Sequence, residues 1–403
     1  MIARLVSEKK ILVCVGPGGV GKTTTAAALA TLAARANRRT LVSTIDPAPR
    51  LADAFGVALS AEPTCVPERV SVQLNAKSDR LFVARLDTAL AFSRLVEEQV
   101  SDPAMRRRIF DNPIYRQITS TLTGSQEYAA TLALYELVRA ARFDVIVLDT
   151  PPTAHALDFL DAPHRIAEAV ASPALQWFAK PSGGSRFSLQ RLRSGGAVVL
   201  KRLGRFVGSD FMEDIGAFLA DFQVVLTGFL ERAQTIEARL RQPDVGFVLV
   251  LAPETAAVDE ALSFEKKLRE SGIPLSAFVV NRIHGRAAQP SAAPVSREVL
   301  RQGLRARHEL TDFGDDAIEA AAGQLATLAR ERDILGDAEQ REIARLARAQ
   351  PRIPIVQVPL LPNDVTNLDA LRTISEHLAS SGNPSPQGDE TDARSERVSR
   401  SEP

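Results

Sequence analysis

Cysteine is almost absent from this sequence of 403 residues, which contains only Cys14 and Cys65. Two thiols without a Cys-x-x-Cys pair support neither a disulfide framework nor a structural zinc site, so we expect no zinc. Cys14 lies inside the apolar run Ile11–Val15, where we expect a buried and unreactive thiol. With only two cysteines, the chain also cannot form a metal or metalloid site from three of its own thiols.

An excess of one charge and long apolar runs are also missing. Lys and Arg together number 49, as do Asp and Glu, so the formal net charge is zero. A neutral chain has no overall attraction to nucleic acid or to an anionic membrane. No apolar run approaches the ~20 residues needed to cross a bilayer, and the N-terminus lacks the layout of a signal peptide. We expect a cytoplasmic protein with no nucleic-acid partner and no direct membrane insertion.

Short apolar runs alternate with Ala- and Leu-rich helical stretches along most of the chain. This alternation is typical of a parallel sheet covered on both faces, so we predict an α/β fold with a doubly wound, mostly parallel sheet. The predicted strands are Ile11–Val15, Thr40–Ile45, Val145–Leu148, Gly246–Leu251, Ala277–Val280 and Ile355–Val358. The predicted helices are Thr24–Ala36, Ser125–Ala141, Ala256–Ser271, Ala317–Ile334, Asp337–Ala349 and Asp364–Leu378.

The interval from about residue 163 to residue 242 does not follow this alternation. Lys180–Ser209 is basic and contains no acid, which predicts either a flexible surface excursion or a segment that binds a partner or client. A helix is predicted from Asp210 to Leu240, because apolar residues recur on one broad face that either packs in a core or forms a groove. That face contains Phe211, Ile215, Phe218, Leu219, Phe222, Leu226, Phe229 and Leu230.

These patterns divide the chain into segments of different character. The two halves of the α/β core are predicted at residues 1–102 and 243–379, with a further strand and the loop after it at 143–162. A helical segment is predicted at 103–142 and a helical, partly flexible insert at 163–242. The stretch Arg286–Val295 is predicted to be a loop, and the polar tail 380–403 is predicted to be disordered.

The segment Gly16-Pro17-Gly18-Gly19-Val20-Gly21-Lys22-Thr23 matches the phosphate-loop pattern G-x-x-x-x-G-K-[ST]. It follows an apolar strand and precedes an Ala-rich helix, as such a loop requires, whereas a glycine-rich turn that binds nothing needs no such context. Backbone N–H groups would surround the β-phosphate, Lys22 would neutralise the β- and γ-oxygens, and Thr23 would ligate Mg²⁺. The predicted nucleotide-binding residues are Gly16, Gly18, Gly19, Val20, Gly21, Lys22, Thr23 and Thr24.

Two acids follow predicted strands at the edge where open parallel sheets bind ligands. Asp149 ends the apolar run Val145–Leu148, as in a Walker B strand, and would reach the Mg²⁺ shell through water. Asp46 ends the strand Thr40–Ile45, where it either serves as a turn residue or orients the attacking water. Guanine-specific P-loop proteins carry an Asn-Lys-x-Asp motif, whose Asp accepts both guanine N–H groups. This chain has Asn281-Arg282-Ile283-His284, without an acid at the fourth place, which favours ATP over GTP.

Several motifs in order resemble those of the ArsA-type ATPases, which include arsenite-pump ATPases and targeting factors for tail-anchored membrane proteins. Gly16–Thr24, Asp46–Phe55 and Asp149–Leu157 resemble the P-loop, switch I and switch II of that family. The match extends through Pro253-Glu254, Val279–Arg282 and Val358–Pro362, so it covers about Lys9 to Leu378 and is most similar to the bacterial ArsA-like branch. The resemblance implies that Asp46 activates water, Asp149 couples to Mg²⁺, and Asn281 reads the adenine edge beside Pro359 and Leu360. It also implies a dimer that closes on ATP and moves client-binding helices, here from Pro103–Thr123 and Pro163–Gln242.

The chain departs from the family pattern at Pro17. Many members carry a lysine at this position that reaches the phosphates of the partner subunit, and proline has neither a charge nor an N–H group. Slower hydrolysis, a substitute such as Arg50, and a heterodimer whose partner supplies the lysine all remain open.

The client and the effector also differ from those of known members. No Cys-x-x-Cys pair follows the Asn281 strand, and the absence of a three-thiol site disfavours arsenite. Only Met105 and Met212 are available for a methionine-lined groove, so a hydrophobic client or membrane partner would have to use the phenylalanine and leucine face. His155 in switch II is predicted to be a structural loop residue.

The sequence thus predicts a Mg²⁺-dependent ATPase with Asp46, Lys22 and Asp149 as catalytic residues and Thr23 and Asp149 at the metal. It would act as a homodimer, or as a heterodimer with a paralogue, that moves or holds a partner in membrane-protein targeting or transport. The alternative is a weakly hydrolysing, nucleotide-sensing subunit of a heterodimer with a catalytic paralogue. A signal-recognition-type GTPase is disfavoured by the missing guanine-reading acid and by the segment Asp149-Thr150-Pro151-Pro152.

Overall fold

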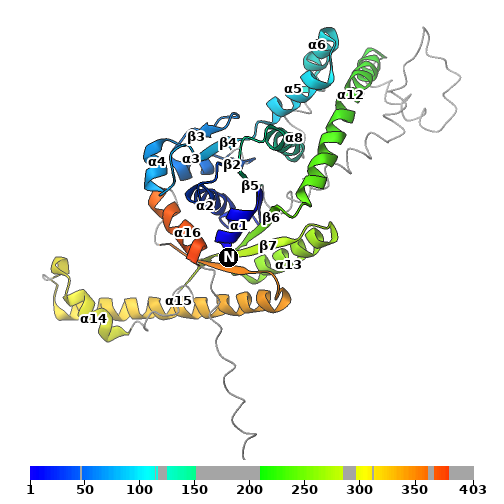
Figure 1. Ribbon diagram of the computed structural model, residues 1–403. Coiled ribbons are helices and arrows are strands. Elements are labelled where there is room, and N and C mark those ends of the chain that lie inside the picture. Colours follow the sequence, from blue (N-terminus) through cyan, green and yellow to red (C-terminus); the bar gives the residue numbers. More distant parts are fainter. Residues whose placement is uncertain are drawn as a thin grey trace, which may run out of the picture.

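An eight-stranded sheet with the order β3-β4-β2-β5-β1-β6-β7-β8 forms the centre of the computed structural model (Figure 1). The structure describes residues 1–45, 48–113, 115–116, 125–150, 209–284, 296–310, 313–361 and 367–380. The strands are β1 (Ile11–Val15), β2 (Thr40–Thr44), β3 (Thr64–Cys65), β4 (Leu81–Arg85), β5 (Val145–Asp149), β6 (Val245–Leu251), β7 (Leu275–Ile283) and β8 (Ile355–Pro359). All neighbours pair in parallel except β3 and β4, which confirms the predicted α/β fold with a mostly parallel sheet.

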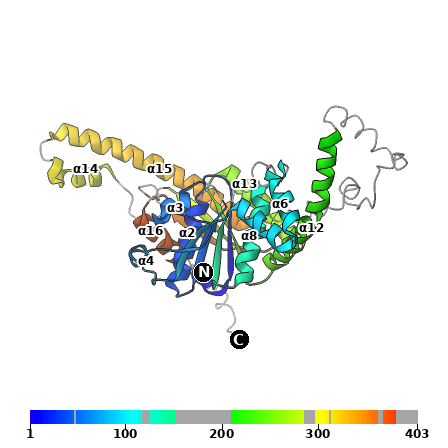
Figure 2. The same ribbon diagram turned by 90° about the horizontal axis from the view of Figure 1, so that it is seen from above.

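Helices cover both faces of the sheet (Figure 2), because successive side chains of each strand point to opposite sides. On β1, Leu12 and Cys14 pack on the face of α1 (Ile2–Glu8), α2 (Lys22–Arg35) and α16 (Leu368–Ser380), with α3 (Arg50–Phe55) and α4 (Glu68–Gln73) beside them. Ile11, Val13 and Val15 pack on the face of α8 (Ser125–Ala140) and α13 (Thr255–Glu270). Cys14 is buried as predicted, and burial raises the pKa of its thiol far above the ordinary value, which keeps it protonated and unreactive.

A second core lies among the helices at one end of the molecule. It joins α5 (Thr88–Gln99), α6 (Pro103–Asp111), α8 and α12 (Ser209–Leu240), which rise together from the sheet in Figure 1. Phe218, Phe222 and Phe229 of α12 are buried there, and the ring of Phe92 stacks on Phe229 with centroids 6.2 Å apart. The described part of the predicted apolar face is therefore core; the side chains of Phe211, Ile215 and Leu219 lie outside the described residues.

An ionic network holds three of these helices together. Arg232 of α12 is buried and pairs with Glu98 of α5 and Glu136 of α8, while Arg139 of α8 pairs with the same two carboxylates. The guanidinium of Arg232 also lies 5.2 Å from the ring centre of Tyr135. Because breaking a buried pair leaves an uncompensated charge, we expect α5, α8 and α12 to move as one unit.

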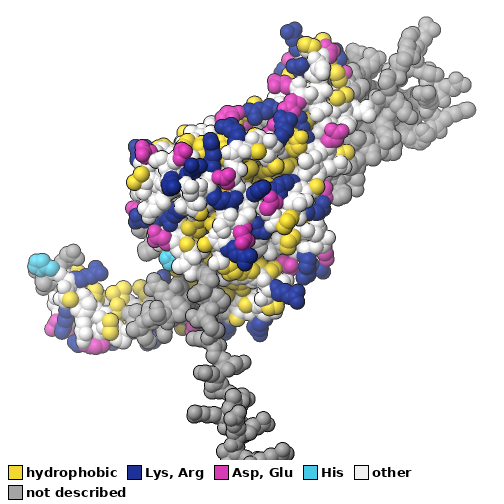
Figure 3. All heavy atoms as spheres, in the orientation of Figure 1, with side chains coloured by type: hydrophobic (Ala, Val, Ile, Leu, Met, Phe, Trp, Pro, Cys, Tyr) yellow, Lys and Arg dark blue, Asp and Glu magenta, His cyan; other side chains and the backbone are white. Residues whose placement is uncertain are grey.

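A helical hairpin extends beyond the sheet on the other side (Figures 1 and 2). It consists of α14 (Arg297–Arg305), a short turn at His308–Leu310, and α15 (Asp315–Ala349), a single helix of 35 residues. The prediction of two helices separated near Gly336 was wrong. Glycine weakens a helix by about 1 kcal/mol, but Gly336 is buried where α15 packs on the core, and packing outweighs that cost. Leu325, Leu328 and Leu335 of α15 are exposed. Figure 3 shows hydrophobic side chains, in yellow, along this hairpin.

The remaining sequence predictions have mixed outcomes. Strands β3 and β4 were missed, although Leu81–Ala84 is a continuous apolar run that is buried in the sheet. The predicted loop Arg286–Val295, most of Lys180–Ser209 and the tail after residue 380 lie outside the described residues. Among the helices that are described, none combines the length and the hydrophobicity needed to span a membrane.

Candidate nucleotide-binding site

The order of the strands reverses at β1, whose neighbours are β5 on one side and β6 on the other. Open parallel sheets bind ligands at the carboxyl ends of the strands beside such a reversal. The loop formed by residues 16–21 connects β1 to α2 at this place, so the topology puts the predicted phosphate loop where a ligand is expected.

Two glycines fix the course of this loop. Gly16 has φ +149°, and a Cβ atom on it would lie 2.0 Å from the backbone oxygen of Val250 in β6. Gly21 has φ +98°, and a Cβ there would lie 2.3 Å from Nδ2 of Asn281 in β7. Larger side chains at these positions would push the loop away from both strands, which explains why the pattern requires glycine here.

Lys22 is the first residue of α2 and is 8% exposed. Its Nζ donates a hydrogen bond of 2.8 Å to the backbone oxygen of Pro17, so the ammonium group lies over its own loop. The N-cap residue of α2, Gly21, has no side chain to cap the first turn. The N–H groups of this turn and the ammonium group together provide a site for an anion such as a phosphate.

Asp149 accepts hydrogen bonds from two threonines on the same oxygen. The hydroxyl of Thr23 donates to its Oδ2 at 2.8 Å, and the hydroxyl of Thr44 donates at 2.9 Å. Asp149 pairs in register with Thr44 across β2 and β5, which places the two side chains on the same face of the sheet. The carboxylate is 1% exposed and therefore links the P-loop to the strand that leads into switch I.

These groups suit a magnesium ion. Mg²⁺ is usually bound by one or two protein oxygen atoms together with phosphate and water. The hydroxyl of Thr23 and the carboxylate of Asp149 lie next to each other and present oxygen atoms of that kind. The predicted metal residues are thus brought together, at hydrogen-bonding distance.

The two switch segments are described only in part. Asp46 lies outside the described residues, as do Pro151–Leu157 of switch II, including His155. After Asp46, α3 begins at Arg50, whose side chain is exposed. At the start of switch II, the hydroxyl of Thr150 donates to the backbone oxygen of Cys14 at 2.7 Å, which anchors this segment to β1.

The predicted base-reading residues lie at the ends of β7 and β8. Nδ2 of Asn281 donates to the backbone oxygen of Val20 at 2.8 Å, so this side chain ties β7 to the P-loop. The backbone N–H of Leu360 donates to the oxygen of Ile283 at 2.9 Å, which places Leu360 and the preceding Pro359 beside the end of β7. Leu360 is 38% exposed, so part of its side chain is open to contact with a ligand.

Sequence reasoning missed two residues at this edge. Thr44 was placed in a strand but given no role, because its contact with Asp149 depends on the register of β2 and β5. Glu339 of α15 was not considered, yet its carboxylate contacts His284 at the end of β7. Neither residue belongs to a short motif, so only the spatial arrangement reveals them.

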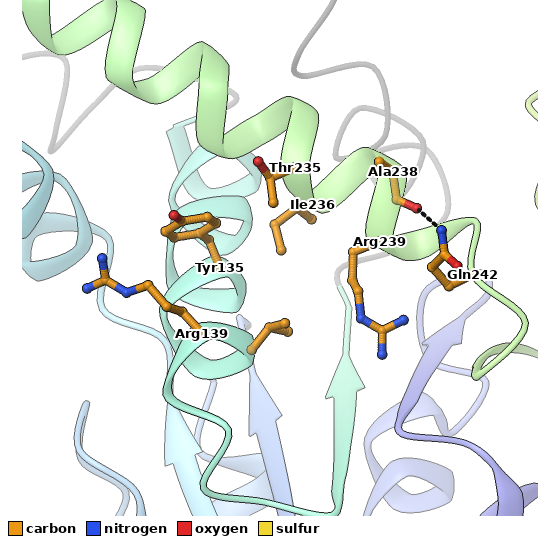
Figure 4. Close-up of a pocket in the computed structure, with 8 residues that line it drawn as sticks. Tyr135, Arg139, Thr235, Ile236, Ala238, Arg239 and Gln242 are labelled. Carbon is orange, nitrogen blue, oxygen red and sulfur yellow. Dashed lines mark hydrogen bonds between the residues drawn. The ribbon is translucent and has the colours of Figure 1, made fainter.

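A cavity of about 460 Å³ lies elsewhere, between α8 and α12 (Figure 4). It lies near the C-terminal ends of these helices, which lead into the first residues of β5 and β6, and so at the edge of the sheet opposite the P-loop. Its two arginines, Arg139 and Arg239, are already paired with acids. This cavity is therefore distinct from the nucleotide site. Its lining is Tyr135, Val138, Arg139, Thr235, Ile236, Ala238, Arg239 and Gln242.

The sheet topology, the glycine-dependent loop and the buried lysine define a P-loop nucleoside triphosphatase. Residues 9–183 match the family described as anion-transporting ATPase. The chain is 26% identical over 274 residues to "ATPase GET3" of Malassezia globosa, which covers 68% of this chain and 72% of the relative. It is 22% identical over 367 residues to "ATPase get3" of Schizosaccharomyces pombe, which covers 90% and 89% of the two chains. An "ATPase ASNA1 homolog" of Cryptosporidium parvum is 26% identical over 291 residues, 71% of this chain and 68% of the relative. The part of the chain at residues 9–183 is thus similar to the ArsA-type ATPases, and the chain is an ATPase.

The contact between Thr44 and Asp149 leads to a first prediction. Replacing Thr44 by valine keeps the shape but removes one donor to the carboxylate, so Asp149 is held less firmly. We expect the Mg²⁺ concentration for half-maximal ATP hydrolysis to rise by about fivefold, which corresponds to one net hydrogen bond. Titration of hydrolysis with Mg²⁺ measures this change.

Two further variants complete this experiment. Thr44→Ser retains a hydroxyl and should restore the wild-type Mg²⁺ dependence. Ser43→Ala removes a neighbouring buried hydroxyl that donates to Ala84 on β4, and it should have no effect on that dependence. An unchanged midpoint in folded Thr44→Val would contradict a role for Thr44 in positioning Asp149.

Proposed function

We propose that this ATPase is Mg²⁺-dependent and couples the state of its nucleotide to the helices that rise from the sheet, in order to move or hold a protein partner. The observation that carries the proposal is the shared contact of Thr23 and Thr44 with Asp149. Mg²⁺ bound beside these residues would neutralise charge on the β- and γ-phosphates. The residue that would orient the attacking water is Asp46.

A short series of contacts supports the coupling to the helices. The backbone N–H of Leu86 donates to the oxygen of Thr44 at 2.9 Å. The next residue, Asp87, caps α5 by accepting a hydrogen bond of 2.9 Å from the backbone N–H of Leu90. Since α5 is joined to α8 and α12 through Glu98 and Arg232, a shift at Thr44 would act on the whole helical unit.

We further propose that the chain works as a dimer whose nucleotides lie at the interface. Pro17 cannot reach a partner's phosphates, so a substitute such as Arg50, or a paralogue bearing a lysine, would provide that charge. The relatives named GET3 and ASNA1 homolog belong to the same family, whose targeting factors handle tail-anchored membrane proteins. A hydrophobic client of this kind is the best candidate partner. The described phenylalanines of α12 are buried in the core of the helical unit, so in this structure they are not exposed to such a client.

Steady-state hydrolysis of ATP by the purified chain, compared with Asp46→Asn, tests the catalytic part of the proposal. We expect the variant to bind Mg·ATP normally and to lose about 100-fold or more in turnover, because it cannot orient the attacking water. Asp79→Asn provides the control, since Asp79 is an exposed acid that precedes β4 at the opposite edge of the sheet. Equal turnover in wild type and Asp46→Asn would remove Asp46 from the mechanism.

The alternative is a nucleotide-sensing subunit that barely hydrolyses ATP on its own. Pro17 is the observation that favours it, because the loop lacks the lysine that acts across the dimer. Tight binding of Mg·ATP without turnover, followed by activity when a lysine-bearing paralogue is added, would support this reading. Full turnover by the chain alone would exclude it.

A further inference from the structure

The end of β7 is joined to α15 by a buried carboxylate. Oε2 of Glu339 accepts a hydrogen bond of 2.7 Å from the backbone N–H of His284. Nδ1 of the same histidine lies 2.6 Å from Oε1 of Glu339. Glu339 is 5% exposed, so both of its oxygen atoms are engaged by one residue in a site that is largely closed to water.

This contact occurs at the place that decides base selection in guanine-specific P-loop proteins. His284 occupies the fourth position of Asn281-Arg282-Ile283-His284, where those proteins have the acid that reads guanine. The sequence has no acid at this position, but the fold brings the carboxylate of Glu339 to it from a residue 55 positions away. An acid, Glu339, is therefore present beside the fourth position of the motif, but both of its oxygen atoms are engaged by His284.

The first residues of the motif hold this arrangement in place. Oδ1 of Asn281 accepts from the backbone N–H of Arg282 at 3.0 Å, and Arg282 has φ +66°, which is uncommon for a residue with a side chain. Ile283 is bound to Leu360 of the segment after β8. The backbone before His284 is thus held by the Asn281 side chain and by Leu360, and the contact of His284 with Glu339 connects it to α15.

We propose that the pair of His284 and Glu339 makes the site selective for adenine over guanine. Guanine would need a carboxylate to accept its ring N–H and its amino group, and Glu339 is engaged by His284 instead. A guanine at this end would leave polar groups without partners, whereas adenine has no such pair of donors. This inference rests on the proposed function, since it assumes that the base lies at the ends of β7 and β8.

The experiment measures the affinities of Mg·ATP and Mg·GTP by displacement of a fluorescent ATP analogue. In wild type we expect ATP to bind more tightly. Replacing His284 by leucine removes the ring that engages Oε1 while the backbone contact remains, so that oxygen becomes available to guanine. The preference for ATP should then fall by about tenfold, the value of one hydrogen bond to a charged group. His284→Ala, which adds no bulk, provides a second variant in case the leucine variant does not fold.

Two glutamate variants distinguish selectivity from a general loss of structure. The double variant His284→Leu, Glu339→Gln lacks the carboxylate and should regain the preference for ATP. The control is Glu265→Gln, which neutralises another buried glutamate. Glu265 lies on α13 and accepts a hydrogen bond of 2.7 Å from the side chain of Gln350, so this variant should leave the preference for ATP unchanged.

The outcomes separate the two proposals. An unchanged preference in folded His284→Leu and His284→Ala overturns the inference while the ATPase assignment stands. A preference that falls equally in the double variant also overturns it, because the carboxylate would then not be responsible. If neither nucleotide binds the wild-type protein, the proposed function itself fails.

Discussion

Replacing Lys22 by alanine is expected to lower the affinity for ATP by about 100-fold or more while the fold is preserved. A charge-assisted contact to the β- and γ-oxygens would be lost, and the phosphate charge would remain without a counter-charge in the loop. In the structure the ammonium group donates a hydrogen bond of 2.8 Å to the backbone oxygen of Pro17 in its own loop. Alanine has a high helix propensity and suits the first residue of α2, so thermal unfolding should change little.

Equilibrium binding of a fluorescent ATP analogue measures this effect, and Lys9→Ala provides a closely matched control. Nζ of Lys9 also donates to the backbone oxygen of a proline, Pro243, at 2.6 Å. Lys9 precedes β1 whereas Lys22 follows it, so the two lysines lie at opposite ends of the same strand. Lys9→Ala should bind ATP as wild type does. If Lys22→Ala retained wild-type affinity, the P-loop would not be the nucleotide site.

The loop that we predict to bind phosphate could be located from the sequence because its parts are contiguous. The loop from Gly16 to Thr23 is a single run of residues, and the apolar strand before it and the helix after it define its surroundings. The predicted β1 has the same bounds as the strand in the structure, since two lysines precede this short apolar run and Gly16-Pro17 follow it.

The contacts across the sheet could not be predicted in this way. Thr44 meets Asp149 because β2 and β5 are neighbours in register, although β3 and β4 come between them in the chain. Glu339 meets His284 because α15 returns to the sheet after forming the hairpin with α14. Strand order and helix course are set by packing of the whole chain, and a single sequence does not reveal them.

The error at Gly336 has a related cause. A glycine near the end of an apolar helical pattern, such as Gly336 after Ile334-Leu335, often marks the end of a helix because it lowers helix propensity. Here the helix continues, and Ile343 and Leu346 beyond the glycine are buried against the sheet. Packing of α15 against the sheet therefore keeps the helix continuous through Gly336, although the local helix propensity predicts a break.

Replacing Asp149 by asparagine is expected to reduce ATP hydrolysis by about 100- to 1000-fold while binding of ATP without Mg²⁺ stays within about twofold. The variant keeps the size of the side chain but loses the charge that accepts hydrogen bonds from both Thr23 and Thr44. The two hydroxyls can still meet the amide, so the fold should persist. What is lost is the negative oxygen beside Thr23, the proposed metal ligand, and with it the expected alignment of Mg·ATP.

Hydrolysis at saturating ATP and Mg²⁺, together with binding in the presence of a chelator, separates this effect from that of Lys22. The matched control is Asp144→Asn. Asp144 directly precedes β5 and accepts from the backbone N–H of Arg39 at 2.8 Å, at the end of the strand opposite to Asp149. The Asp144→Asn variant should hydrolyse ATP at the wild-type rate. We propose that Lys22 contacts phosphate and that Asp149 acts through the metal. Lys22→Ala should therefore bind ATP poorly with or without Mg²⁺, and Asp149→Asn only in the presence of Mg²⁺. Equal losses in both assays for Asp149→Asn would show that the carboxylate supports the loop itself.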